Sequence, residues 1–244
     1  MKKYAYLVLL LALLLFMPLC KNKSNDDNNN DNNPPPPPQF SHRILMLGRS
    51  VMGGWFEHWG NSEHVNRNGY DLYYGQMESP PDIVTTAIQK INQQNVDATW
   101  AVFFKFCFVD FYGNSRQDAE YSLNEKKQYL EQIRQEVRTQ RNAILIIGNA
   151  LPETCNNTSQ NLIWLHKEYN AWVNQLASSD SRIKVFDQYS VLATAGGCLK
   201  QGYAQDPWDA HLTNQAYNAL DQQFFPFLNA NVQKQVFTTP TGIL

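Results

Sequence analysis

The sequence predicts an α/β domain in which buried strands alternate with amphipathic helices. Short apolar runs that are rich in β-branched and aromatic residues are typical of strands buried on both faces. Such runs cover residues 43–48, 99–109, 143–148 and 183–186. The chain has 244 residues, of which 43% are hydrophobic and 17% charged, so it is long enough and apolar enough for one main domain with an ample core.

Amphipathic segments lie between and after these strands. Their apolar residues recur at helical spacing over residues 82–95, 119–140, 162–177 and 214–225. Pro80-Pro81 is a natural start signal for the first of these helices, and Thr213 is the expected N-terminal cap of the last. We expect each apolar stripe to pack on the sheet.

The N-terminal segment has the composition of an export signal. Residues 1–20 begin with a positive charge and continue as an apolar run that is short for a full bilayer span, which predicts a signal peptide. Cys20 closes this run where a lipoprotein carries its lipidated cysteine. Leu19 stands where such signals usually have a small residue, so lipidation of Cys20 and simple cleavage nearby both stay open.

A tether follows the signal and separates it from the domain. Residues 21–39 contain no apolar residue other than proline, so they cannot bury enough surface to fold and are predicted to be disordered. The five consecutive prolines favour a stiff polyproline II spacer. The predicted domain therefore covers residues 40–244, secreted or held at the cell envelope by an N-terminal membrane anchor.

Charge, histidine and cysteine content limit the classes of partner. The net charge of -2 with interspersed signs gives no basic stripe for nucleic acid. The histidines lack metal-ligand spacing, so neither a metal nor another cofactor is expected. His58 and His64 are expected at solvent-facing positions, with substrate contact near Ser50 as the alternative. Cys155 and Cys198 lie in polar, loop-like stretches and could pair after export, whereas Cys107 lies in an apolar run typical of a buried thiol.

Ser50 stands at a chemically useful place. It follows the first strand through Gly48-Arg49 and precedes a helix, so it is expected at the carboxyl edge of the sheet, where ligands bind in open α/β folds. A helix N-terminus there also offers free backbone N–H groups to a developing oxyanion. A simple capping role for Ser50 is the alternative interpretation.

His211 lies in a polar loop just before the last helix, close to two carboxylates. A histidine needs an acidic neighbour to act as a base, because the carboxylate fixes the imidazole tautomer and stabilises the imidazolium. Asp209 and Asp206 are both candidates for this partner.

The order of these parts resembles that of the SGNH hydrolases, the GDSL-like esterases and lipases. Gly48-Arg49-Ser50 stands where the family has Gly-Asp-Ser, and His211-Leu-Thr-Asn-Gln-Ala-Tyr217 resembles its closing block. The G-x-S-x-G elbow of the α/β-hydrolases is absent because Met52 follows Ser50 at the glycine position. The resemblance implies a three-layer α/β/α sandwich with a mostly parallel, flavodoxin-like sheet over residues 40–244, and Ser50 and His211 as nucleophile and base.

Two departures from the family pattern leave some site residues open. The family's acid position, three before the histidine, holds Trp208; Asp209 is our first choice because Asp-x-His resembles alginate-type acetyltransferase relatives, and Asp206 is the second. The Gly-x-Asn-Asp block is missing, and the corresponding strand end carries Lys105 and Cys107, either of which could border the site.

The oxyanion donors must come from elsewhere in the chain if that block is missing. We expect the backbone N–H of Ser50 and that of a nearby glycine, with Gly54 first and Gly75 as the weaker candidate.

The expected activity is hydrolysis of short acyl esters through an acyl-enzyme, with a small molecule or a surface glycan as the substrate. An O-acyltransferase acting on surface glycans would use the same residues. A tethered binding protein on a decayed scaffold is a further alternative.

Overall fold

The computed structural model describes residues 40–232 and 235–236. The predicted signal peptide of residues 1–20, with Cys20, and the predicted tether of residues 21–39 lie outside the described residues. Both therefore stay predictions.

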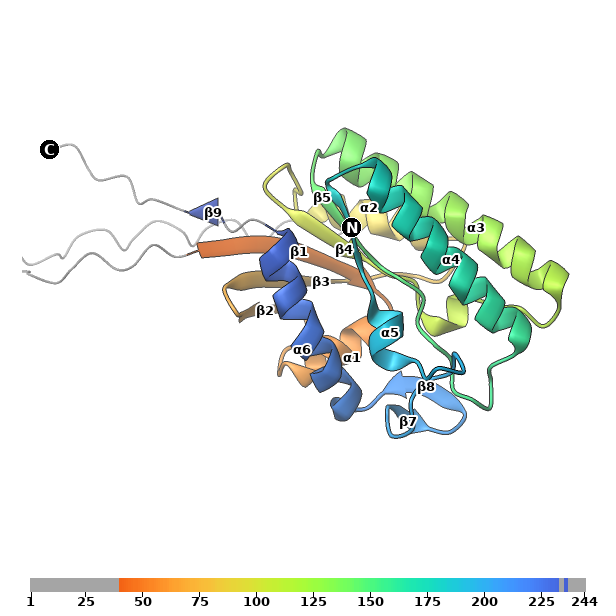
Figure 1. Cartoon of the computed structure of the whole chain (residues 1–244). Helices are drawn as coiled ribbons and strands as arrows, with labels where there is room; N and C mark the ends of the chain where they lie inside the picture. Colours follow the sequence, from red (N-terminus) through yellow and green to blue (C-terminus); the bar gives the residue numbers. More distant parts are fainter. Residues whose placement is uncertain (1–39, 233–234, 237–244) are drawn as a thin grey trace, which may run out of the picture. The chain divides into compact units, whose positions relative to one another are not determined.

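A mostly parallel sheet forms the centre of the domain (Figure 1). The strand order is β2-β3-β1-β4-β5-β6, in which β2 alone runs antiparallel to its neighbour, and β9 adds an antiparallel pair to the start of β1. The strands are β1 (Phe40–Gly48), β2 (His64–Arg67), β3 (Tyr70–Gln76), β4 (Ala101–Phe104), β5 (Ile144–Gly148), β6 (Ile183–Phe186) and β9 (Gln235–Val236).

Helices cover both faces of this sheet, so the domain has three layers as predicted (Figure 1). One face carries α1 (Ser50–His58), α5 (Gln188–Leu192) and α6 (Asn214–Asn231); the other carries α2 (Ile83–Gln93), α3 (Arg116–Arg134) and α4 (Gln160–Ser179). A short 3₁₀ turn, η1 (Phe108–Asp110), follows β4, and a π-helical turn, η2 (Gln135–Gln140), ends the α3 segment.

The first strand separates two apolar cores. Ile44 and Met46 face the core under α1 and α6, while Leu45 and Leu47 face the core under α2, α3 and α4. All four side chains are fully buried. This two-sided burial is why the strand is continuously apolar rather than alternating. None of the helices in the described part of the chain is long and apolar enough to cross a membrane.

A separate two-stranded hairpin lies between the sheet strands and α6. It consists of β7 (Ala204–Asp206) and β8 (Asp209–Leu212), which pair in antiparallel fashion. Thr213 follows directly and caps α6, because its side chain accepts a hydrogen bond from the Ala216 amide. The predicted cap is therefore confirmed.

The structure differs from the sequence prediction in several elements. The strand predicted over 99–109 ends at Phe104, and the chain then turns into η1. Strands β2 and β3 were not predicted, because the segment 64–76 mixes polar residues with Gly and Asn. Helices α4 and α6 extend beyond their predicted bounds, α3 begins earlier than predicted and passes into η2, and α2 is shorter than predicted. Helix α5 was not predicted.

Candidate active site

Ser50 begins α1 at the carboxyl end of β1. Only one residue, Arg49, separates strand from helix, and it has extended backbone angles. The turn is tight enough that a Cβ on Gly48 would lie 2.6 Å from the Cβ of Met52, so glycine is required there. The exposed Ser50 side chain is thereby held at the sheet edge.

His211 and Asp209 come from strand β8 and meet Ser50 from the far end of the chain. The Nε2 atom of His211 lies 2.8 Å from Ser50 Oγ, and its Nδ1 atom lies 2.5 Å from Asp209 Oδ1. Hydrogen bonds from the backbone amide and the imidazole of His211 lower the pKa of the Asp209 carboxyl, which keeps it ionised. This line of three groups can carry the Ser50 proton to the imidazole.

Asp206 ends β7, opposite Asp209 across the hairpin turn, and Trp208 lies in the turn. The Asp206 carboxylate accepts a hydrogen bond from the Trp208 amide at 2.9 Å and has no contact with the imidazole of His211. The Trp208 side chain is 67% exposed. Of the two carboxylates left open by the sequence, the structure therefore brings Asp209 to the histidine.

Lys105 and Cys107 follow the end of β4, and both are buried. The Cys107 thiol lies 4.0 Å from Ser50 Oγ, so this side chain borders the site as well as filling the core. The Lys105 ammonium has no hydrogen-bond partner among the described residues. Burial lowers its pKa to about 8, although the nearby Cys107 and Asp110 oppose this effect.

Asp110 joins the strand end to the serine turn and was not singled out from the sequence. One carboxylate oxygen accepts from the Cys107 amide at 2.7 Å, and the other is 2.5 Å from the Arg49 guanidinium. Asp110 is almost fully buried, so this ion pair ties the residue before Ser50 to the end of β4. A lone aspartate after a predicted strand gives no signal for such a role.

The N-terminus of α1 supplies backbone N–H groups beside Ser50 Oγ. The amides of Met52 and Gly53 both donate to the Arg49 carbonyl. The amide of Ser50 lies in the first turn, where helical amides have no partner within the helix. The Ser50 N–H therefore stays the predicted oxyanion donor.

The two predicted glycine donors, Gly54 and Gly75, lie within regular secondary structure. Gly54 lies in the second turn of α1, where amides donate to the carbonyl four residues earlier. Its missing side chain instead makes room for Tyr217, whose Oη would be 2.3 Å from a Cβ there. Gly75 lies within β3, and a side chain on it would meet Leu47 on the sheet face opposite α1.

A groove of about 820 Å³ opens beside Ser50 and His211. Amide, carboxylate and hydroxyl groups provide most of its polar lining: Glu57, Ser62, Glu63, Gln76, Gln93, Gln94 and Gln205. His64 also lines the groove with a half-exposed ring. His58 lies in an adjoining hollow of about 350 Å³ that shares Gly54, Glu57, Gln205 and Tyr217 with the groove. Its side chain is 13% exposed, so the prediction of a solvent-facing position is wrong for His58. The serine therefore faces a polar, open channel.

The described residues contain one disulfide, between Cys155 and Cys198, which are the two cysteines predicted to pair. Within the same residues, no three His, Cys, Asp or Glu side chains come together in a way that could hold a metal ion.

An α/β/α sandwich with this mostly parallel sheet has the fold of the SGNH-type, or GDSL-type, hydrolases. Solved structures with this fold resemble the chain at low identity. A lipolytic protein of the G-D-S-L family from Veillonella parvula is 17% identical, with a TM-score of 0.55 over 75% of this chain and 96% of that one. A GDSL-like lipase from Bacteroides thetaiotaomicron is 13% identical, with a TM-score of 0.55 over 78% and 88%.

The same fold also occurs in the OSK domain of Drosophila Oskar, which is 12% identical with a TM-score of 0.51 over 75% of this chain and 86% of that domain. The sequence matches no family model and no curated protein at a significant level. Proteins of different description thus share the fold, so the reaction must be argued from the site.

Proposed function

We propose that the protein is an exported serine esterase that hydrolyses short acyl esters through an acyl-enzyme. The observation that carries this proposal is the continuous contact from Ser50 Oγ to His211 Nε2 and from His211 Nδ1 to Asp209. A buried or purely structural serine has no need of a histidine and a carboxylate aligned in this way.

The mechanism follows from these contacts. Ser50 Oγ attacks the ester carbonyl as its proton passes to His211 Nε2, and the resulting oxyanion lies near the Ser50 N–H. The imidazolium then protonates the leaving alcohol as the C–O bond breaks, which leaves an acyl group on Ser50. Water, deprotonated by His211, releases the acid and restores the serine. Asp209 stabilises each imidazolium form.

The groove supports a polar alcohol portion. Its amide and carboxylate side chains suit hydroxyl groups as hydrogen-bonding partners and offer no long apolar channel for a fatty chain. Export agrees with the Cys155–Cys198 disulfide, because such bonds persist in oxidising compartments. We therefore place the substrate among surface glycans or small polar esters.

The aligned contacts favour an enzyme over a decayed binding protein, since a scaffold without chemistry would have no reason to keep them. An O-acyltransferase would use the same first half-reaction and would differ only in the acceptor. Adding a glycan acceptor during turnover distinguishes the two activities: transfer yields acylated glycan, whereas hydrolysis yields free acid alone.

The test is hydrolysis of acyl nitrophenyl esters of increasing chain length by the parent and by Ser50→Ala. We expect the variant to lose activity by a factor of at least about 10³, because the nucleophile is gone. A fluorophosphonate probe should label the parent at Ser50 and leave folded Ser50→Ala unlabelled. Equal turnover by the two proteins would show that Ser50 is not the nucleophile.

A further inference from the structure

The β7–β8 hairpin holds the His211–Asp209 pair yet has little core of its own. It is short and does not join the central sheet. The side chains of Asp209 and His211 are 48% and 36% exposed. Two short strands alone are marginally stable, so contacts from outside the hairpin must fix the position of the histidine relative to Ser50.

The loop after β5 supplies such contacts to the hairpin turn. Asn157 Nδ2 donates to the Trp208 carbonyl at 2.7 Å, and Asn156 Nδ2 donates to the Pro207 carbonyl at 3.1 Å. Both acceptors lie within two residues of Asp209 in the chain. Two neighbouring side-chain amides thus hold the backbone of the turn that leads into the acid.

Glu153 adds a buried carboxylate beneath the same turn. The Asn157 side chain opposes the rise in the pKa of the Glu153 carboxyl, and the charges of Asp209 and His211 act on the same group, so all three residues lie close to it. The net effect of burial raises that pKa. The Asn157 side-chain amide therefore lies between the buried Glu153 carboxylate and the backbone of the hairpin turn.

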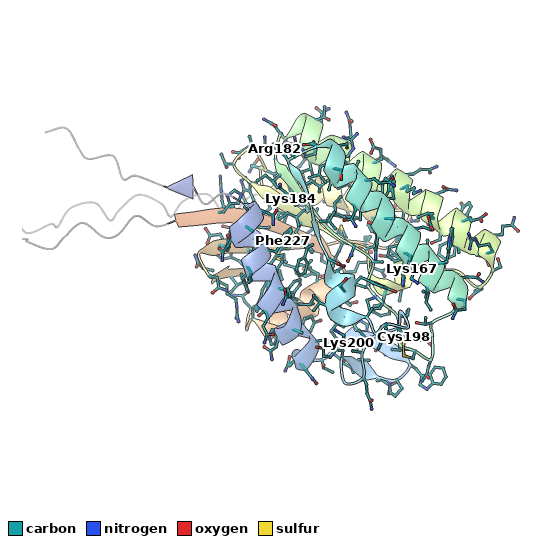
Figure 2. All side chains as sticks on the ribbon, viewed as in Figure 1. Lys167, Arg182, Lys184, Cys198, Lys200 and Phe227 are labelled. Carbon is teal, nitrogen blue, oxygen red and sulfur yellow. A yellow bond between two sulfur atoms is a disulfide. The ribbon has the colours of Figure 1, made fainter. Side chains whose placement is uncertain are left out.

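The Cys155–Cys198 disulfide anchors this loop to the segment between α5 and β7, on which Figure 2 labels Cys198. The Leu199 amide donates to the Glu153 carbonyl at 2.8 Å beside the disulfide. We call residues 153–158 with Cys198 the clamp. The disulfide and the backbone hydrogen bond hold the loop to the segment before β7, and the two asparagine side chains hold the loop to the hairpin turn. Together these contacts restrict the position of the hairpin relative to Ser50.

We propose that Asn157 is a positioning residue for the His211–Asp209 pair and that the disulfide of the clamp holds Asn157 in place. This inference rests on the proposed esterase function. Asn157 does not line the groove, and its side chain donates to the hairpin turn. Its effect should therefore fall on the alignment of the acyl-transfer step and leave ground-state binding in the groove unchanged.

The first experiment compares Asn157→Ala with Asn161→Ala in the full chain. Asn161 is a matched control because its side-chain amide also donates to a backbone carbonyl, that of Asn114, away from the hairpin. We expect kcat for the best nitrophenyl ester to fall about 10-fold in Asn157→Ala with KM unchanged. The Asn161→Ala protein should keep the parent value, and the melting temperatures of both should stay close to it.

A second readout does not depend on turnover. The His211 backbone amide donates to the Asp209 side-chain carboxylate at 3.0 Å, so its hydrogen exchange reports whether that carboxylate keeps its place on His211. Exchange should become about 10-fold faster in Asn157→Ala and should not change in Asn161→Ala. If the parent shows no turnover at all, the proposed esterase function is wrong. The exchange measurement would still show whether Asn157 holds the His211–Asp209 pair in place.

The disulfide is tested with the Cys155→Ala/Cys198→Ala variant, alone and combined with Asn157→Ala. If the disulfide acts through Asn157, the combined variant should lose no more activity than the more impaired of the two separate variants. Parent-like kcat and exchange in Asn157→Ala, or equal losses in Asn161→Ala, would overturn the positioning role. Additive losses in the combined variant would overturn the link between the disulfide and Asn157.

Discussion

Individual residues decide which carboxylate serves His211. Asp206 and Asp209 differ by three positions, and the sequence favoured Asp209 but kept Asp206 open, because neither stands at the usual acid position three residues before the histidine. The hairpin register settles their contacts: Asp209 reaches the imidazole, while Asp206 binds the Trp208 amide. A two-residue spacing on a strand brings both side chains to one face, which explains why Asp-x-His works on β8.

This difference gives a prediction for the two matched amide variants. Asp209→Asn should lower kcat on the order of 10⁴-fold, because the amide neither fixes the tautomer nor stabilises the imidazolium. Asp206→Asn should keep kcat within about 10-fold of the parent, because its carboxylate only accepts a backbone hydrogen bond. Initial-rate kinetics on the same ester check both. If Asp206→Asn lost more activity than Asp209→Asn, Asp206 would be the catalytic partner of His211 in place of Asp209.

Residue-level reasoning from the sequence identified Ser50, His211 and the two cysteines of the disulfide. Their signals are local: a serine at the end of an apolar run, a histidine beside acids, and cysteines in polar stretches. It missed Asp110 and Asn157, whose partners Arg49 and Trp208 are 61 and 51 positions away in the chain. Contacts over such distances leave no periodic trace in one sequence.

Among the helices and strands as well, some could be predicted from the sequence and others could not. The strands that are buried on both faces are visible as apolar runs, so β1, β5 and β6 were predicted close to their bounds. Lys105 and Cys107 were assigned to a strand because apolar residues continue past Phe104, whereas the chain there turns toward the site. The β7–β8 hairpin escaped prediction because its strands are short and polar.

The contact between α1 and α6 fixes the orientation of α1, the helix that begins at Ser50. Tyr217 donates to the Val51 carbonyl at 3.0 Å, and its ring fills the space that Gly54 leaves. The tyrosine is almost fully buried. Its hydroxyl cannot move away from a new side chain without losing that hydrogen bond.

Gly54→Ala should therefore destabilise the protein, against the usual gain of roughly 1 kcal/mol for this exchange within a helix. Overpacking against the Tyr217 ring should lower the unfolding free energy by about 1–3 kcal/mol, as measured by urea denaturation. Gly196→Ala is the control, since its nearest atom would be 3.6 Å away at Thr194. If Gly54→Ala instead stabilised the protein, α6 and its Tyr217 side chain would have to shift away from α1 at little cost.

For the molecule as a whole, burial makes the folding stability depend on pH. His166 lies on α4 between Phe111 and Tyr189, and both of its ring nitrogens lack hydrogen-bond partners among the described residues. Burial lowers its pKa to about 3. The folded protein thus keeps this ring neutral at pH values where the unfolded chain binds a proton.

The protein should lose stability as the pH falls from about 6.5 towards 3, because the unfolded state takes up the His166 proton first. The loss amounts to about 1.4 kcal/mol per pH unit from this group. His166→Leu removes the proton acceptor, so the variant should not share this loss. In urea titrations from pH 6.5 down, the unfolding free energy of the variant minus that of the parent should therefore rise by that amount per pH unit. His64→Leu, at a half-exposed position, should follow the parent curve. A gap that stays constant with pH would mean that His166 titrates normally in the folded protein, and acid sensitivity would then have to come from the carboxylates.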